Sequence, residues 1–372
     1  MKIKVLQLGK FHPIKGGVEK VMMAFVLGLS SRAIRCDMLC AADDDDIGEA
    51  TLNSYAKLYK TETVVKKSAT MISPNMITKL RNICHDYDII HIHHPDPMSA
   101  LALFLSGYKG KVVLHWHSDI LKQQVLLQLY KPLQSWLVGR ADLILGTTPV
   151  YVKESRWLRK AQPKVSYLPI GVRERQAEDM LIHAIRSQYP GKKIIYSMGR
   201  LVEYKGYEYL IEAAEILGDE YVVLIGGSGP LKGKLQQQVR SLGLEERVHI
   251  LGFIPKEVEA AYYAACDVYC LSSTLRTEAY AIVQVEAMSV GRPIVATKIP
   301  GSGVPWVNQD GVSGLNVEPR SAKAIAEAVR KLCSNPALYK KLSLGAKDRY
   351  RRFFTREAMI DGLLSHYQGL LG

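Results

Sequence analysis

The chain has 372 residues, which is long for one hydrophobic core and comfortable for two domains. Its apolar content of 48% is typical of a globular protein, and no stretch approaches the ~18 apolar residues of a membrane-spanning helix. The formal charge of +13 comes mainly from residues 1–171, where 23 Lys and Arg stand against 14 Asp and Glu.

The first half of the chain contains short apolar runs separated by helical patterns, at 4–9, 36–41, 88–94, 112–117, 143–148 and 165–171. Runs without polar alternation are typical of strands in a parallel sheet covered on both faces, so we expect a doubly wound α/β domain. Gly16 and Gly17 follow the first strand, in a turn that lets the backbone approach a ligand closely. A plain strand–helix turn is the alternative, and the missing G-x-G-x-x-G fingerprint argues against a nicotinamide enzyme.

Five of the ten histidines lie near the ends of two of these strands, namely His91, His93, His94, His115 and His117. A zinc site is one interpretation. However, no cysteine or spaced carboxylate completes an obvious ligand set, and strand alternation places His91 and His93 on one face but His94 on the other. The six cysteines include no C-x-x-C pair, so we expect buried free thiols in a reducing compartment.

The second half repeats the pattern, with runs at 194–199, 221–227, 248–253, 268–273, 293–297 and 314–318. A polar helical segment closed by Pro-Gly precedes these runs and places the domain junction near 171–191. We therefore predict domains at 1–171 and 192–354, joined by a linker at 172–191. Arg200 and Lys205 follow the first strand of the second domain, at a turn that contains Gly206, and two cations there suit a diphosphate.

Glu278 and Glu286 are eight positions apart, or about two helical turns. The spacing places one carboxylate at the mouth of a helix and the other further along it, before a helix stop at Gly291-Arg292-Pro293. Free N–H groups at a helix N-terminus bind phosphate, and nearby carboxylates can accept bonds from hydroxyls. The alternative is two surface glutamates on an ordinary amphipathic helix.

The ordered set of motifs resembles the retaining glycosyltransferases of family 4, which have the GT-B fold. Its second half carries GR-x4-KG, GGSGP, LGFIP and Glu-x7-Glu, and its first half carries Gly16-Gly17, DYDIIHIHHP and HWHSD. The resemblance implies two Rossmann-like domains that face each other across a cleft, with a terminal helix at 355–372 that completes the first domain. Relatives often read Glu-Gly/Ala-Phe-Gly where this chain has Glu278-Ala279-Tyr280-Ala281. We expect the small alanine to leave the site intact.

The resemblance also implies roles for individual residues in moving a hexosyl group, with a mannosyl group as the first guess, from a nucleotide diphosphate sugar to a hydroxyl of a glycan or lipid-linked acceptor. The catalytic residues would be His117, Glu278, Arg200 and Lys205. In this assignment Arg200 and Lys205 neutralise the diphosphate, Glu286 takes the ribose and Glu278 takes the sugar. The other donor-binding residues would be Gly16, Gly17, Gly252, Ile254, Tyr280, Ala281 and Ile282.

No cofactor or metal is expected, because Arg200, Lys205 and a helix dipole can balance the leaving diphosphate. Asp86-Tyr87-Asp88 and the Asp43–Asp46 run are read as strand-entry and loop residues instead of metal ligands. Two alternative functions remain open: a sugar-nucleotide 2-epimerase of the GT-B fold, and a non-catalytic binding relative.

The basic first half predicts a further partner. No nucleic-acid motif accompanies its charge, so we expect an anionic membrane surface, with a cytoplasmic protein held peripherally at the inner face of the plasma membrane. The predicted contacts are the basic clusters in 57–81 and 153–164, with Met71, Ile72, Met76, Ile77 and Leu80 inserting shallowly. A basic solvated surface without a partner is the alternative, as is a core position for those apolar residues.

Overall fold

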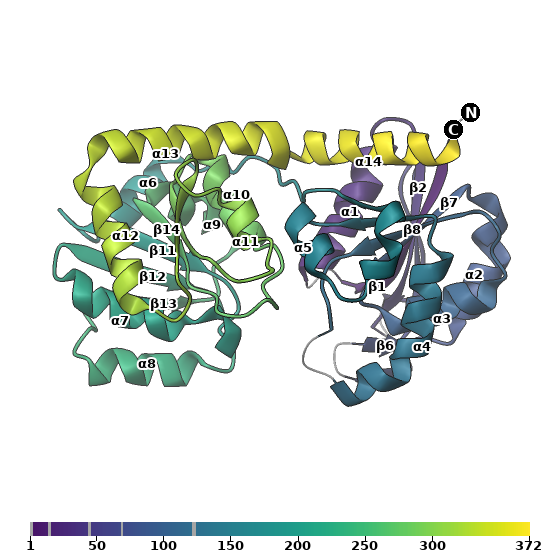
Figure 1. The fold of residues 1–372 in the computed structure, drawn as a ribbon, viewed down its shortest axis with the longest axis horizontal. Helices are drawn as coiled ribbons and strands as arrows, with labels where there is room; N and C mark the ends of the chain where they lie inside the picture. The colour runs from purple at the N-terminus through teal and green to yellow at the C-terminus, as the bar shows by residue number, and fades with distance from the viewer. Residues whose placement is uncertain (1–2, 14–15, 44–45, 68–69, 121–123) are drawn as a thin grey trace. The chain divides into compact units, whose positions relative to one another are not determined.

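The computed structural model describes residues 3–13, 16–43, 46–67, 70–120 and 124–372. The chain divides into two compact units: unit 1 comprises Met1–Ile170 with Arg356–Gly372, and unit 2 comprises Gly171–Thr355. Each unit contains a mostly parallel sheet covered by helices on both faces (Figure 1). The fold predicted from the continuous apolar runs, two Rossmann-like α/β domains, is therefore confirmed.

The sheet of unit 1 has eight strands in the order β10-β9-β8-β7-β1-β2-β4-β3. All neighbours pair in parallel except β3, which runs antiparallel at the edge. The strands are β1 (Lys4–His12), β2 (Arg35–Ala42), β3 (Gly48–Asn53), β4 (Ala56–Glu62), β7 (Ile89–His94), β8 (Lys111–Trp116), β9 (Leu143–Gly146) and β10 (Val165–Tyr167). A separate hairpin joins β5 (Val65–Lys67) to β6 (Thr70–Ile72).

The helices of unit 1 are α1 (Gly17–Ser30), α2 (Asn75–Ile83), α3 (Pro97–Ser106), α4 (Gln124–Arg140), α5 (Pro149–Glu154) and α14 (Arg356–Leu371). The last helix of the chain packs on α1. Arg32 forms an ion pair with Asp361 at 2.5 Å, and Gly28 leaves room for the Ile360 side chain, which lies 2.5 Å from where a Cβ would stand. Helix α3 packs against both α2 and α4 on the other face of the sheet (Figure 1).

Unit 2 has a six-stranded parallel sheet in the order β13-β12-β11-β14-β15-β16. Its strands are β11 (Lys193–Met198), β12 (Tyr221–Gly226), β13 (Val248–Gly252), β14 (Val268–Leu271), β15 (Ile294–Thr297) and β16 (Gly314–Val317). Its helices are α6 (Asp179–Arg186), α7 (Tyr207–Leu217), α8 (Lys232–Ser241), α9 (Lys256–Ala265), α10 (Ile282–Ser289), α11 (Val304–Val307), α12 (Ala322–Ser334) and α13 (Pro336–Arg349). Helix α6 packs on α9, so the segment predicted as a linker at 172–191 belongs to unit 2.

Burial explains why the predicted strands were recognisable. All six residues of β12 and all six of β7 are buried, as a sheet covered on both faces requires. The six cysteines are free thiols and five of them are buried, in agreement with the prediction. Among the described residues, none of the helices combines the length and the apolar character that crossing a bilayer requires.

Candidate active site

The strand order of unit 2 reverses between β11 and β14, because β12 and β13 extend the sheet to one side and β15 and β16 to the other. In doubly wound sheets, ligands bind beyond the carboxyl ends of the strands at such a switch point. Lys205 lies in a 3-10 turn, Glu203–Lys205, that follows β11. Glu278 lies in the loop that follows β14. The switch point therefore brings together two residues that the sequence singled out for different reasons.

Lys205 and Glu278 form a buried ion pair. Nζ of Lys205 donates to Oε2 of Glu278 at 2.5 Å, and Oγ of Ser273 donates to the same oxygen at 2.8 Å. Both charged residues are less than 10% exposed. Burial disfavours the charge of Lys205, but the Glu278 carboxylate, together with Tyr207 and Tyr204, outweighs this effect and raises the pKa of the lysine. Lys205 is therefore held as a cation in a site largely closed to water.

Glycine at position 206 allows this turn to lie close to the segment that follows β14. Gly206 has a φ of 63°, and an added Cβ would lie 2.4 Å from the carbonyl oxygen of Ser272. Oγ of Ser272 also donates to the carbonyl oxygen of Lys205 at 2.9 Å. The KG dipeptide thus serves two purposes, because the lysine supplies the charge and the glycine permits the approach.

The loop from Glu278 to α10 contains one residue in a conformation that favours glycine. Ala281 caps α10 with a φ of 60°, in the left-handed region that costs roughly 1–2 kcal/mol for a residue with a Cβ. Relatives often carry glycine at this position. The small effect that we expect from alanine is therefore the local steric cost of its Cβ. Tyr280 and Ala281 are buried, and the helix begins at Ile282.

Glu286 binds to a different set of partners from Glu278. Its carboxylate accepts a hydrogen bond from the Arg175 guanidinium and another from the Tyr263 hydroxyl at 2.9 Å. Arg175 also lies 3.3 Å from a carboxylate oxygen of Glu259. Burial acts against the charge of Arg175, but Glu286 and Glu259 outweigh it and raise its pKa. Sequence reasoning missed Arg175 and Tyr263, since neither belongs to the motifs that drew attention.

The structure places the remaining donor-site candidates at the same edge of the unit 2 sheet. Arg200 follows β11 and its side chain is exposed, whereas Lys205 is buried. Burial and Glu278 raise the pKa of the Tyr204 hydroxyl, whereas Lys205 and Arg200 act to lower it. Gly252 ends β13 with a φ of 75°, and Ile254 is buried two residues later.

The glycine-rich loop after β12 packs directly on the turn that carries Arg200. An added Cβ at Gly227 would lie 1.9 Å from the carbonyl oxygen of Gly199, and the φ of Gly227 is 127°. The GGSGP motif therefore acts here through close backbone packing at the sheet edge.

In unit 1 the strand order reverses between β1 and β7. Asp96 follows β7, caps α3 and accepts a hydrogen bond from the Lys10 amide at 2.5 Å. Gly16 caps α1 and Gly17 is its first residue. Lys15, the neighbour of this glycine pair, lies outside the described residues. His117 directly follows β8 and is 6% exposed.

The histidines separate onto the two faces of the unit 1 sheet, as strand alternation predicted. His91 and His93 face the side of α1, where the Phe25 ring lies 5.5 and 6.0 Å from them, centre to centre. His94 faces the other side and stacks on Trp116 at 3.7 Å. His91, His93 and His115 each offer a ring nitrogen within 4.8 Å of the others. However, both ring nitrogens of His91 and of His93 are already hydrogen-bonded to protein groups.

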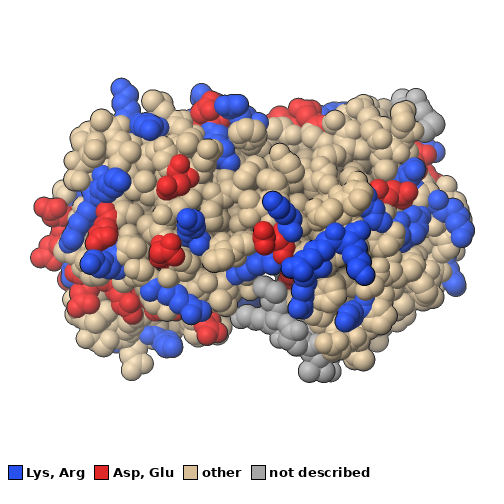
Figure 2. Space-filling model, in the orientation of Figure 1, with Lys and Arg blue, Asp and Glu red and all other residues tan. Residues whose placement is uncertain are grey.

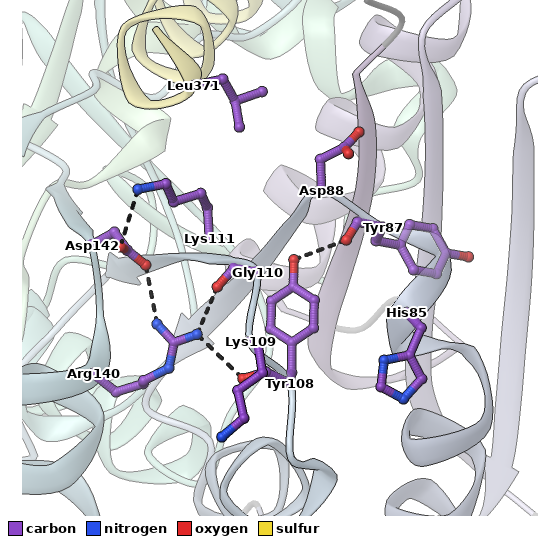
Figure 3. Close-up of a pocket in the computed structure, with 10 residues that line it drawn as sticks. All are labelled: His85, Tyr87, Asp88, Tyr108, Lys109, Gly110, Lys111, Arg140, Asp142 and Leu371. Carbon is purple, nitrogen blue, oxygen red and sulfur yellow. Dashed lines mark hydrogen bonds and ion pairs between the residues drawn. The ribbon is translucent and has the colours of Figure 1, made fainter.

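A hollow of about 590 Å³ lies at the opposite, amino end of the unit 1 sheet (Figure 3). Arg140 at its wall donates to the carbonyl oxygens of Gly110 and Tyr108, and pairs with Asp142 at 3.1 Å. Asp88, from the Asp86-Tyr87-Asp88 motif, accepts a hydrogen bond from the Lys4 amide at 2.8 Å, as a strand-entry residue does. Arg140, Asp142 and Asp88 thus bond to the protein itself, and the hollow lies away from the carboxyl ends of the strands.

Comparison with known proteins decides the family. The model of Glycosyltransferase Family 4 matches residues 15–175, and that of Glycosyl transferases group 1 matches residues 181–349. The chain is a family 4-type glycosyltransferase. Two curated relatives of this glycosyltransferase, each 29% identical, are the O-antigen chain mannosyltransferase C of Escherichia coli and the D-rhamnosyltransferase WbpZ of Pseudomonas aeruginosa. The alignments cover 96% of this chain and 95% of the first relative, and 91% of this chain and 88% of the second.

Solved structures agree on the fold of the glycosyltransferase. The sucrose-phosphate synthase of Thermosynechococcus elongatus matches with a TM-score of 0.82 at 20% identity, over 99% of both chains. Anabaena HepE in complex with UDP matches with a TM-score of 0.78 at 20% identity, over 99% of this chain and all of the other. The predicted GT-B fold is therefore confirmed, and the enzyme is a transferase.

Proposed function

We propose that this glycosyltransferase moves a hexosyl group from a nucleotide diphosphate sugar to a hydroxyl of a glycan or lipid-linked acceptor, with retention at the anomeric carbon. The observation that carries the proposal is the buried pair of Lys205 and Glu278 at the switch point of unit 2. A cation held in a site of low dielectric stabilises the charge that develops on a leaving diphosphate. Glu278 is then positioned to accept hydrogen bonds from the donor sugar.

The other roles follow from placement at the same edges. Arg200, exposed after β11, would meet the diphosphate from the solvent side, and the amides at Ala281 and Ile282 would meet it at the N-terminus of α10. Glu286 would bind the ribose while Arg175 holds its carboxylate. Gly252 and Ile254 would contact the base, Gly16 and Gly17 would border the donor phosphate and acceptor, and His117 would contact the transferred sugar.

The names of the two relatives that align over most of this chain, a mannosyltransferase and a D-rhamnosyltransferase, favour a donor sugar with the ring configuration of mannose. Mannose and D-rhamnose share that configuration and differ at carbon 6, which carries a hydroxyl in mannose and a hydrogen in rhamnose. A mannosyl donor, or its 6-deoxy analogue, is therefore the first choice. The HepE structure contains UDP, so uridine and guanosine donors both need to be tried.

A donor screen tests the proposal. We expect one of GDP-mannose, GDP-D-rhamnose, UDP-glucose or UDP-N-acetylglucosamine to release nucleoside diphosphate at a rate that increases when membrane lipid extract or polysaccharide fragments are added. Release that does not depend on any acceptor, together with a product epimerised at carbon 2, would indicate the 2-epimerase instead. Tight donor binding without any turnover would indicate the non-catalytic relative.

The same assay tests metal independence. Turnover is expected to persist in excess EDTA, because Lys205 and Arg200 supply the positive charge that a divalent cation would otherwise bring. Loss of activity in EDTA with recovery on adding Mg²⁺ or Mn²⁺ would contradict this and redirect attention to Asp86, Asp88 and the histidines.

We also propose that unit 1 binds an anionic membrane surface from the cytoplasmic side, where a lipid-linked acceptor would be presented. The structure corrects the predicted contacts: Met71, Met76 and Leu80 are buried in the core and cannot insert, Ile77 is half-buried, and Ile72 is exposed. Lys60 and Lys79 of the first basic cluster pair with Asp46 and Glu49. The structure does not describe the side chains of Lys66 and Lys67.

The second cluster fits the membrane proposal better. Lys153, Arg156, Arg159 and Lys160 are all exposed, with Glu154 as the one acidic residue among 153–164. Basic side chains gather over α5 and its neighbours in unit 1 (Figure 2). Each basic residue near an anionic surface contributes about 1 kcal/mol, so four give reversible, salt-sensitive binding.

Liposome flotation tests this surface. We expect the protein to float with phosphatidylglycerol vesicles and not with phosphatidylcholine vesicles, and to be released at about 0.5 M salt. Reversing Arg156, Arg159 and Lys160 to glutamate is expected to abolish flotation. The matched control reverses three exposed lysines of unit 2, Lys323, Lys331 and Lys340, and should float normally. Equal flotation of the two triple variants would remove this cluster from the proposal.

A further inference from the structure

A buried hydrogen-bond network of side chains leads away from His117 into the core of unit 1. Its members come from four elements: Gln7 from β1, His91 and His93 from β7, His115 from β8 and Tyr367 from α14. These five residues are 0% exposed, so their polar atoms must find their hydrogen-bond partners inside the protein.

The first part of this network links His117 to Gln7. Nε2 of His117 lies 2.9 Å from Nδ1 of His93, and Nε2 of His93 lies 2.8 Å from Oε1 of Gln7. The ring planes of His93 and His117 are inclined by 17° with centres 5.2 Å apart, and together with the short distance between the two nitrogens this fits an N–H of one ring pointing at the lone pair of the other. Among the described residues, the His117 ring makes its hydrogen bond through Nε2.

The second part links Gln7 to the terminal helix. Nε2 of Gln7 donates to the Tyr367 hydroxyl at 3.2 Å, and that hydroxyl lies 2.5 Å from Nδ1 of His91. Nε2 of His91 then lies 3.3 Å from Nδ1 of His115. Because the Gln7 amide nitrogen bonds to Tyr367, its oxygen is the atom that faces His93.

The direction of each bond follows from the chemistry of the amide. An amide oxygen only accepts, so Nε2 of His93 must carry the proton. Burial lowers the pKa of His93 and of His117, which keeps both rings neutral with one proton each. Nδ1 of His93 is then an acceptor, Nε2 of His117 is the donor, and Nδ1 of His117 retains its lone pair.

We propose that Gln7 and His93 are positioning residues that fix the tautomer and ring orientation of His117, so that its Nδ1 presents an unprotonated nitrogen to a hydroxyl of the bound sugar. The inference rests on the proposed function for the role of His117, but not for its tautomer. For histidines that ligate metals, removing the partner that fixes the tautomer changes affinity or activity by about 10–100-fold, and we expect an effect of this order for His117.

Substitutions at His93 separate positioning from packing. In His93→Asn the amide oxygen can take the place of Nδ1 and accept from His117, whereas His93→Leu offers no acceptor. We expect His93→Leu to lower kcat by about 10–100-fold with donor KM changed far less, and His93→Asn to recover most of the loss. Gln7→Met, which removes the acceptor for His93 at similar volume, is the second variant in case His93→Leu fails to fold.

Phe25→Leu is the matched packing control, because Phe25 touches the same rings without a hydrogen bond. Histidine ¹⁵N NMR of the full chain gives a readout independent of turnover, with the His117 signals assigned from their loss in His117→Ala. Wild type should show the Nε2-protonated tautomer of His117, and Gln7→Met a mixture.

An Nδ1-protonated His117 in wild type would overturn the proposal, as would equal effects of His93→Leu, His93→Asn and Phe25→Leu on kcat. If no donor supports transfer, the proposed function fails, and the NMR tautomer alone then decides whether Gln7 and His93 orient the ring.

Discussion

Replacing Lys205 with alanine is expected to lower turnover by a factor on the order of 10² or more, with weakened donor binding. The variant removes a buried cation at the switch point of unit 2, where the proposed leaving diphosphate gathers negative charge. It also leaves the Glu278 carboxylate buried without its cation, which typically destabilises a protein by about 3–5 kcal/mol. Steady-state kinetics and urea unfolding measure the two effects separately.

A double variant separates catalysis from stability. In Lys205→Met with Glu278→Gln, neither buried charge remains, so we expect stability to recover much of what Lys205→Ala loses. Turnover should stay low, because the cation is still missing. The matched control is Lys323→Ala, which breaks an exposed pair with Glu327 and should cost less than about 1 kcal/mol with normal kinetics. Near-wild-type turnover in Lys205→Ala would exclude the lysine from the mechanism.

Acidification is expected to unfold unit 1 well above the pH at which carboxylates titrate. Five histidines of this unit are buried: His91, His93, His94, His115 and His117. Burial lowers the pKa of each, to about 3 for His94 and His115 and well below the ordinary value for the others. Other histidines add to the effect for His91, His93, His115 and His117, and Lys10 adds to it for His93, His94 and His117.

The direction in which pH changes the stability of unit 1 follows from which state, folded or unfolded, binds the protons. Above the unfolded-state pKa of about 6.5 both states are neutral at these positions, and the stability is fully present. As the pH falls below about 6.5, the unfolded chain takes up to five protons that the folded unit excludes, until the pH approaches the folded-state values. At about 1.36 kcal/mol per proton and pH unit, the loss reaches roughly 7 kcal/mol by pH ~5.5 as an upper bound. Total domain stability is only about 5–15 kcal/mol.

Urea unfolding at several pH values, read by hydrogen exchange to separate the two units, measures the effect. Substituting one buried histidine, as in His115→Gln, should reduce the pH slope of unit 1 stability by about 1.4 kcal/mol per unit. The matched control His85→Gln removes an exposed histidine and should leave the slope unchanged. A stability of unit 1 that is flat between pH ~7.5 and ~4.5 would contradict the prediction.

Much of the fold was determined by the sequence alone. Strands buried on both faces must be apolar at every position, so their runs are visible without a structure, and the polar segments between them mark the helices. The separation of His93 from His94 followed from strand alternation alone. Lys205 and Glu278 were identified individually, because each stands in a motif beside a strand end.

Only the tertiary structure showed which of these residues meet. Lys205 and Glu278 are 73 positions apart, and they pair because β11 and β14 are neighbours in the sheet. Arg175 reaches Glu286 across 111 positions, and Tyr367 reaches His91 across 276. Sequence periodicity reports on neighbours within a strand or a helical turn, whereas these contacts depend on strand order and on how helices pack on the sheet. For the same reason, the pattern of Met71, Met76 and Leu80 was compatible with a membrane surface, and packing placed all three in the core.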